Sequence, residues 1–265
     1  MPEAFILSAV LGRAALISGS RELPLPVRLS QAGDLHAKDV LDEALRQAGI
    51  SLTRLEMVAW GGELDQFDDL SLVVRVQRAG ASGLQAVFLA AQAVAAGDMD
   101  VVAAGGSGWA EQASNRPGFS AVRASQGDGS AALVLASTRA VGRYNLSPAG
   151  RLAARVVLRP DPSNPQLSAQ QVVWAAVRRA SLELDEIEAI AISDAGDNLP
   201  SPWAEALGVA EEKIFSADGE RMGKAEGAAA VIYLLRHLQQ TGQRYGLLLY
   251  WPGGGPMMAS VIERV

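Results

Sequence analysis

Residues 80–96 read GASGLQAVFLAAQAVAA, a helix-forming stretch that is apolar on nearly every side. A helix of this kind is buried all round, so we expect it to lie between two layers of the fold. The same pattern returns at residues 224–240, KAEGAAAVIYLLRHLQQ. A second pair of segments matches without a gap, KDVLDEALRQAGISLTRLEMVAWGG at 38–62 and QQVVWAAVRRASLELDEIEAIAISD at 170–194. Repetition in the same order predicts one supersecondary unit that is used twice.

Short apolar runs alternate with helical segments in both repeats, a pattern that favours buried strands joined by helices. Strands are expected at 4–10, 55–60, 72–76, 101–104, 131–136, 153–158, 187–192, 246–250 and 258–262. Helices are expected at 37–48, 82–96, 168–180 and 225–240. Ser168 and Gln171 have capping-box spacing and are expected to open the third of these helices.

This order predicts an α/β fold, a five-layer α/β/α/β/α sandwich in which two central helices lie between two sheets. The two similar halves are expected at residues 1–140 and 141–265, as one compact duplicated unit.

The composition excludes several classes of function. There is no cysteine among the 265 residues, which excludes disulfides, thiolate metal sites and a cysteine nucleophile. His36 and His237 lie far apart in the sequence, so we expect no metal. The net charge of −6 argues against a nucleic-acid surface. The apolar helix at 84–96 is too short to span a bilayer and the N-terminus has no basic region, so we expect no membrane segment and a cytoplasmic protein.

Four collinear segments resemble the thiolase and β-ketoacyl synthase superfamily. They are ASGLQAVFLAAQAVAAGDMDVVAAGG at 81–106, GDGSAALVLAS at 127–137, GKAEGAAA at 223–230 and RYGLLLYWPGGG at 244–255. The resemblance covers nearly the whole chain. It implies the thiolase fold, a dimer, and a place in acyl-chain condensation or cleavage within fatty acid or polyketide metabolism.

The departures from the family pattern fall on the chemistry. The resemblance implies that Gly80 replaces the nucleophilic cysteine, Lys224 the histidine of G-H-x-x-G-A, and Trp251 the second cysteine. The family's further Asn- or His-bearing motif would fall near Asp194. The connection at 106–127 is too short for the loop domain that covers coenzyme A in the family, so we expect no cofactor and no catalytic residue.

Each of these positions also has a plain structural interpretation. Gly80 cannot form an acyl-enzyme and fits a tight turn. Ser82 could replace the nucleophile only with a base in reach, and helix capping or packing is the simpler role. Lys224 could act as a base or Schiff-base amine if buried, or could form a salt bridge with Glu226 or Asp194.

Trp251 could fill the volume of a lost pocket or form a wall for an acyl chain. Three glycines follow it and could either offer N–H groups to an oxyanion or form a turn: Gly253, Gly254 and Gly255. The resemblance implies that one apolar strand pairs across a dimer interface, although it could instead be internal. This strand comprises Leu72, Val73, Val74, Arg75 and Val76.

The leading hypothesis is a non-catalytic subunit that forms a heteromer with a cysteine-bearing thiolase or ketosynthase homologue. The resemblance implies a role like that of a chain-length factor, in shaping the partner's acyl pocket, stabilising it, or presenting an acyl carrier protein. Two alternatives stay open. One is an enzyme of altered chemistry that uses Lys224 with Asp194 or Glu226 on an acyl thioester. The other is a homodimeric acyl-ligand-binding protein.

Overall fold

A computed structural model describes most of the chain. The described residues are 3–13, 37–62, 67, 72–108, 129–193, 201–217, 223–252 and 255–265. The first half contains β1 (Ala4–Arg13), α1 (Ala37–Ala48), β2 (Met57–Gly61), β3 (Val73–Val76), α2 (Ser82–Ala96), β4 (Val101–Gly108), β5 (Gly129–Ser137) and α3 (Thr138–Tyr144). The second half contains β6 (Gly150–Leu158), α4 (Pro165–Arg179), β7 (Ala189–Ser193), α5 (Ser201–Leu207), β8 (Ile214–Ser216), α6 (Glu226–Thr241), β9 (Tyr245–Tyr250) and β10 (Met257–Arg264).

The strands follow the order β3-β2-β4-β5-β1-β6-β10-β9-β7-β8. Read inward from either end, this order matches β3 with β8, β2 with β7, β4 with β9, β5 with β10 and β1 with β6. Within each half, the middle strand of the parallel part, β2 or β7, is parallel to both of its neighbours. All the other neighbouring strands in each half are antiparallel. The internal repeat predicted from the sequence is therefore a repeat of topology.

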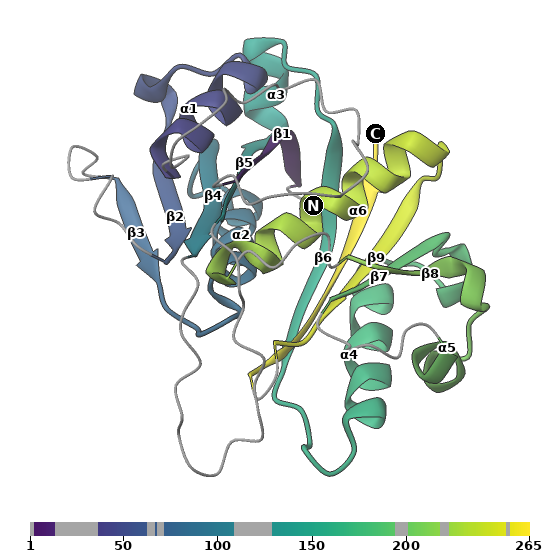
Figure 1. The fold of residues 1–265 in the computed structure, drawn as a ribbon. Helices are drawn as coiled ribbons and strands as arrows, with labels where there is room; N and C mark the ends of the chain where they lie inside the picture. The colour runs from purple at the N-terminus through teal and green to yellow at the C-terminus, as the bar shows by residue number, and fades with distance from the viewer. Residues whose placement is uncertain are drawn as a thin grey trace, which may run out of the picture.

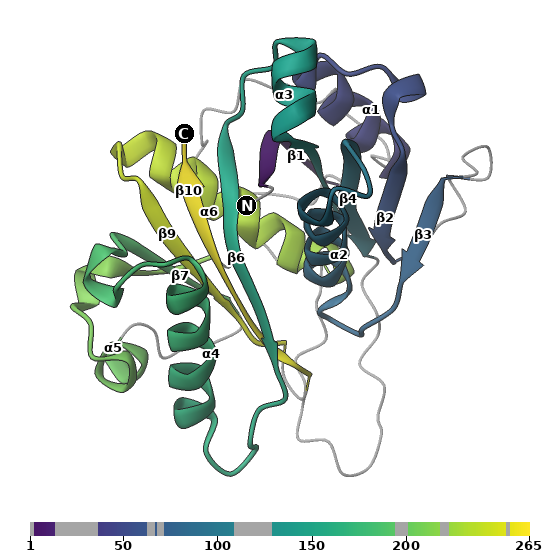
Figure 2. The same ribbon diagram turned by 180° about the vertical axis from the view of Figure 1, so that it is seen from behind.

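The two predicted sheets are joined rather than separate. β1 and β6 are antiparallel neighbours and pair at Phe5 with Arg151 and at Ile6 with Gly150. This narrow junction links the halves into one ten-stranded sheet. The two halves of the sheet diverge on either side of it (Figures 1 and 2).

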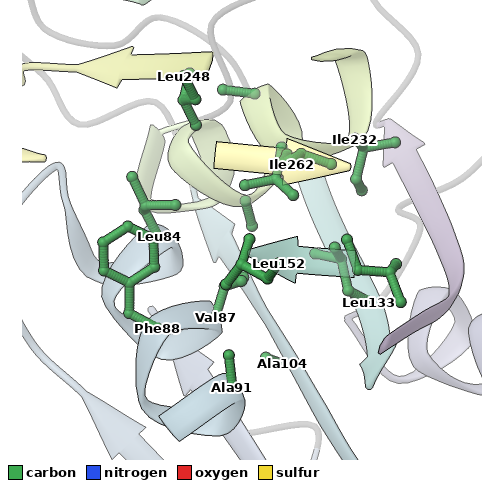
Figure 3. Packing of buried hydrophobic residues seen from close by; sticks show 14 of the residues in the cluster. Leu84, Val87, Phe88, Ala91, Ala104, Leu133, Leu152, Ile232, Leu248 and Ile262 are labelled. Carbon is green, nitrogen blue, oxygen red and sulfur yellow. The ribbon is translucent and has the colours of Figure 1, made fainter. Parts of the chain in front are cut away.

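Three apolar clusters confirm the five layers. One lies between the halves of the sheet and contains the buried faces of α2 and α6 (Figure 3). A second packs α1 on the outer face of the first half, and a third packs α4 and α5 on the outer face of the second half. The α/β fold class with two central helices is confirmed, because strands that contribute to two clusters need helices on both faces.

The two central helices touch through a pair of glycines at equivalent places in the repeats. A Cβ atom on Gly83 of α2 would lie 2.5 Å from the Lys224 carbonyl oxygen. A Cβ atom on Gly227 of α6 would lie 2.6 Å from Leu84 Cβ. Carbon atoms in contact prefer about 3.5–4.0 Å, so both positions require glycine for the helices to pack this closely.

Two glutamates repeat a further structural role. Glu56 Oε2 accepts a hydrogen bond of 2.9 Å from the Val101 N–H at the start of β4. Glu188 Oε2 accepts one of 3.0 Å from the Tyr245 N–H at the start of β9. Each carboxylate satisfies a backbone donor that the strand itself leaves unpaired. The repeat therefore extends from topology to individual side chains.

A charged network closes the junction between the halves. The buried Glu263 carboxylate accepts hydrogen bonds from Arg151 Nε (2.8 Å) and Arg244 Nη2 (2.7 Å). Arg151 also pairs with Glu3, which precedes β1. Burial by itself raises the pKa of Glu263, but the hydrogen bonds from Arg244 and Arg151 outweigh it and hold the pKa below its usual value.

Some boundaries differ from the sequence prediction. α4 begins at Pro165 rather than Ser168, because Asn164 Oδ1 caps it by accepting from the Leu167 N–H at 3.1 Å. Ser168 Oγ instead accepts from the Asp161 N–H at 2.9 Å. The predicted capping box at Ser168 is therefore wrong. The sequence analysis also missed α3, α5 and β8, which are short.

One stretch, Ala79–Ala96, is long and apolar enough by length and composition alone to cross a membrane, with a mean hydropathy of 1.4. It contains α2, and 56% of it is buried inside the protein. This is the character of a central core helix, the role that α2 has here (Figure 1).

Candidate functional site at the entrances of the central helices

The candidate site lies where the two central helices begin. α2 starts at Ser82, and a 3-10 turn, Gly223–Ala225, leads into α6. The Lys224 carbonyl oxygen of this turn faces Gly83 and also Gly106 of β4, where an added Cβ would lie 2.7 Å away. The structure therefore brings the two equivalent helix entrances together, as the repeat implies.

Gly80 has no room for a side chain. A Cβ atom there would lie 2.8 Å from the Cβ of Pro252. The fully buried Tyr250 donates its hydroxyl hydrogen to the Gly80 carbonyl oxygen at 2.8 Å. A side chain at position 80, where the resemblance places the nucleophile, would therefore collide with Pro252. The Tyr250 hydroxyl holds the Gly80 backbone in this position.

Ser82 stabilises the turn that precedes α2. Its hydroxyl donates to the Ala79 carbonyl oxygen at 2.7 Å and accepts from the Arg78 N–H at 2.8 Å. Ala79 has a positive φ of 48°, which is uncommon for a residue with a Cβ, and these two bonds hold the turn that contains it. The hydroxyl is engaged in both directions but does not cap the helix, since the N-cap position of α2 is Ala81 and has no side-chain cap bond.

Lys224 is partly buried, in a turn that Gly223 makes possible with a φ of +56°. Glu226 follows in the first turn of α6, and the buried Ser193 hydroxyl lies 3.5 Å from its Oε1. Asp194 lies outside the described residues. The salt-bridge and catalytic interpretations of Lys224 both stay predictions.

Trp251 points away from Gly80. Side chains alternate along β9, so that Leu248 and Tyr250 join the central cluster, whereas Leu249 and Trp251 pack against the outer cluster beneath α4. Tyr250, not the indole, therefore faces the candidate site. The Trp251 Nε1 atom is buried and has no hydrogen-bond partner among the described residues.

Sequence reasoning missed Tyr250 and Pro252 as the residues beside Gly80. The strand period places Tyr250 and Trp251 on opposite faces of the sheet, but the run LLLYW is apolar throughout and does not show which of them faces the centre.

The glycine cluster is described only at Gly255. Its N–H donates to the Pro252 carbonyl oxygen at 2.8 Å. This N–H is used within a turn and is not offered to an oxyanion. Gly253 and Gly254 lie outside the described residues.

The described residues contain no group of three His, Cys, Asp or Glu side chains that could hold a metal ion. The His237 ring instead stacks on Phe215, with ring centroids 4.2 Å apart. His36 lies outside the described residues.

β3 stands at one end of the sheet and pairs with β2 alone within the described part of the chain (Figure 1). Val74 is 47% exposed and Leu72, just before the strand, is 38% exposed. Leu89 of α2, a neighbouring element, is also an exposed apolar residue. Among the described strands, the one comprising Leu72, Val73, Val74, Arg75 and Val76 is thus an open edge, and its pairing across a dimer interface stays a prediction.

The curated proteins that resemble this chain in sequence include several thiolases. No family model matches the chain. The chain is 32% identical over 145 residues to β-ketoadipyl-CoA thiolase of Pseudomonas aeruginosa, covering 52% of this chain and 36% of that protein. It is 30% identical over 153 residues to steroid 3-ketoacyl-CoA thiolase FadA6 of Mycobacterium tuberculosis, covering 56% of this chain and 37% of that one. The matched part is thus little more than a third of these relatives' own length.

The fold agrees over the whole chain. The crystal structure of Bacillus anthracis acetyl-CoA acetyltransferase superposes with a TM-score of 0.73 and 16% identity, covering 100% of this chain and 99% of the other. Human mitochondrial 3-ketoacyl-CoA thiolase superposes with a TM-score of 0.73 and 15% identity, covering 99% of each chain. Thiolase relatives in sequence and thiolase neighbours in structure agree with the duplicated fold. The chain has the thiolase fold and is similar in sequence to thiolases over about half of its length.

Proposed function

We propose that this chain is a non-catalytic thiolase-like subunit that pairs with a cysteine-bearing thiolase or ketosynthase homologue. The observation that carries the proposal is the closed position at Gly80, where a Cβ would lie 2.8 Å from Pro252. A covalent acyl transfer needs a nucleophile activated at a place such as a helix N-terminus. Here that position has neither a reactive side chain nor the space for one.

The closure involves more than the loss of one cysteine. Tyr250 and Pro252 come from the end of β9, and the tyrosine hydroxyl bonds to the Gly80 carbonyl across the central layer. The glycine contact between α2 and α6 is intact beside it. The central helices pack closely although the site at Gly80 is closed. This combination supports a structural role for the chain in an assembly.

The open edge at β3 supports an assembly partner. An exposed apolar edge strand is an aggregation hazard unless something covers it. Val74 and Leu72 on β3 and Leu89 on α2 expose apolar side chains. In the proposed heteromer the catalytic homologue continues the sheet at this edge, in the cytoplasm, and this chain shapes its acyl pocket, stabilises it, or presents an acyl carrier protein.

The test is co-purification through a tag on this chain from its native source, followed by mass measurement of the intact complex. A heteromer with a cysteine-bearing homologue is expected. Val74→Lys should break the complex, because it places a charge on the proposed interface. Leu167→Lys is the matched control, since Leu167 on α4 is also 47% exposed but lies far from β3 in the fold. A complex that survives Val74→Lys, or no complex at all, counts against the proposal.

A second candidate is an enzyme of altered chemistry. It is favoured by the charged groups at the entrance of α6. Glu226 follows Lys224 by two residues there, and its Oε1 lies 3.5 Å from Ser193 Oγ. Turnover of an acyl thioester by the isolated chain, lost in a folded Lys224→Ala variant, would support it. Absence of turnover in the isolated chain, or turnover unchanged by Lys224→Ala, would remove Lys224 from consideration.

A further inference from the structure

In the part of the chain that the structure describes, β6 has an open edge over most of its length. Its first residues, Gly150 and Arg151, pair with β1 as well as with β10. Among the described residues, the strand from Leu152 to Leu158 pairs with β10 alone. Figure 2 shows this part of β6 running beyond β1, with α4 beside it.

Arg155 lies on the inner face of this open strand. On β10, Met258 and Ile262 belong to the central cluster, and Ser260 lies between them in the alternation, so it faces the same way. Arg155 stands directly opposite Ser260 in the register. Residues opposite each other in an antiparallel pair share a face and lie with Cβ atoms about 5 Å apart.

A second arginine reaches the same edge from the other side. Arg179, at the end of α4 on the outer face, donates from Nη1 to the Arg155 carbonyl oxygen at 2.7 Å. Burial, and after it the charge of Arg179, hold the pKa of the half-buried Arg155 guanidinium below its usual value. Neither arginine has a carboxylate within ion-pair distance in the part of the chain that the structure describes.

The neighbouring hydroxyl is also unsatisfied. Ser260 is fully buried, and its Oγ has no hydrogen-bond partner among the described residues. Polar side chains that are buried without a partner are rare in native proteins and call for an explanation. Among the described residues, the Arg155 guanidinium and the Ser260 hydroxyl thus stand side by side without a hydrogen-bond partner. A half-buried guanidinium beside a second, exposed cation costs stability unless an anion neutralises it.

We propose that Arg155 and Arg179 form an anion site at the open edge of β6, and that its ligand is a phosphate or pyrophosphate group. Guanidinium groups suit these anions because each can donate two parallel hydrogen bonds. Val157, which is 38% exposed two residues along the same strand, would contact an organic group attached to the anion.

The site lies on the face that leads to Gly80. Tyr250 pairs with Met258 on β10, so it is two strands and two residues away from Arg155 on the same side of the sheet. Strand and residue spacings give roughly 12 Å between the two Cα atoms. This inference rests on the proposed function only in that a phosphorylated carrier of an acyl group is the ligand such a subunit would meet.

The experiment measures binding of pyrophosphate to the purified chain by titration calorimetry at low ionic strength, and by thermal unfolding. Wild type should bind saturably, and its Tm should rise by about 5 °C or more at a free concentration about 100 times Kd. Arg155→Gln and Arg179→Gln should each weaken binding about tenfold or more. Arg178→Gln is the matched control, because Arg178 is exposed on the same helix end, whereas it is Arg179 that bonds to the Arg155 carbonyl oxygen and, after burial, lowers the pKa of Arg155.

A further variant separates an anion site from a merely structural role. Arg155→Met should raise Tm in the absence of pyrophosphate, because it removes an unpaired half-buried charge, and should abolish the rise that pyrophosphate causes. Absence of saturable binding in wild type, or equal losses in Arg178→Gln and Arg155→Gln, would overturn the site.

Coenzyme A is the second probe. If it binds more tightly than pyrophosphate and depends on Arg155, the anion belongs to an organic carrier; if the two bind equally, free inorganic anion is the ligand. If the chain binds the anion but no homologue co-purifies, the anion site is supported and the proposed subunit role is refuted. If a homologue co-purifies but the chain binds no anion, the subunit role is supported and the anion site is refuted.

Discussion

Gly80→Ala tests whether the candidate site is closed by packing. The new Cβ would lie 2.8 Å from the Cβ of Pro252, about 1 Å closer than carbon atoms prefer. The proline ring is rigid, and the strand that carries it is fastened to Gly80 by the Tyr250 hydroxyl, so neither side can yield freely. Gly80 does not have the positive φ that by itself would penalise alanine.

Overpacking of this size costs about 1–3 kcal/mol, which for a chain of this length lowers Tm by roughly 2–12 °C. Gly142→Ala in α3 is the matched control, because an added Cβ there meets nothing within 4 Å. That change should be neutral or stabilise by about 0.5–1 kcal/mol, as expected for alanine in a helix.

The assay is chemical denaturation of the two variants and of a double variant, Gly80→Ala with Pro252→Gly. Removing the proline Cβ should recover at least about 1 kcal/mol of the Gly80→Ala cost, seen as non-additivity in the double-mutant cycle. If Gly80→Ala is as well tolerated as Gly142→Ala, the position is open and the argument that a nucleophile has no room there fails.

Three further changes test the rest of the structure. Gly227→Ala should destabilise by at least about 1–3 kcal/mol in denaturation, because its Cβ would meet Leu84 at 2.6 Å. Ser260→Ala should stabilise the unliganded protein by up to about 1 kcal/mol, since it removes a buried hydroxyl without a partner among the described residues; a loss of stability would show that the hydroxyl is satisfied. Glu263→Gln should cost about 2 kcal/mol at pH 7. Because the pKa of Glu263 is lowered in the folded protein, its contribution to stability is present above the unfolded pKa, near 4.5, and is lost as pH falls through the folded pKa. The unfolding free energies of wild type and variant should therefore converge in acid. A difference that stays constant with pH would contradict this.

Periodicity and internal repetition suffice to predict the elements that bury one continuous face. α1 and α2 have the predicted bounds, because apolar spacing and a following glycine, Gly49 or Gly97 in a left-handed conformation, mark where each helix ends. α5 and β8 are too short to show a period. The start of α4 was misplaced because Ser168 has the spacing of a cap, whereas Asn164 supplies the oxygen.

The candidate site could be located from the sequence but its contents could not. The repeat and the family motifs led to the helix entrances, and Gly80 and the turn at Lys224 do lie there. Which side chain faces Gly80 depends on the register of β9, and a shift of one residue exchanges Trp251 for Tyr250. The pairing of Arg155 with Ser260 depends on long-range register in the same way, and no local pattern predicts it.

The central claim is that this chain works as one partner in a heteromer with a catalytic homologue. The most direct test is the mass of the intact complex isolated from the native source through a tag on this chain. The account predicts a complex that contains a cysteine-bearing thiolase or ketosynthase homologue and that is lost with Val74→Lys but kept with Leu167→Lys. A chain that is isolated only as a monomer or as a homodimer would contradict it.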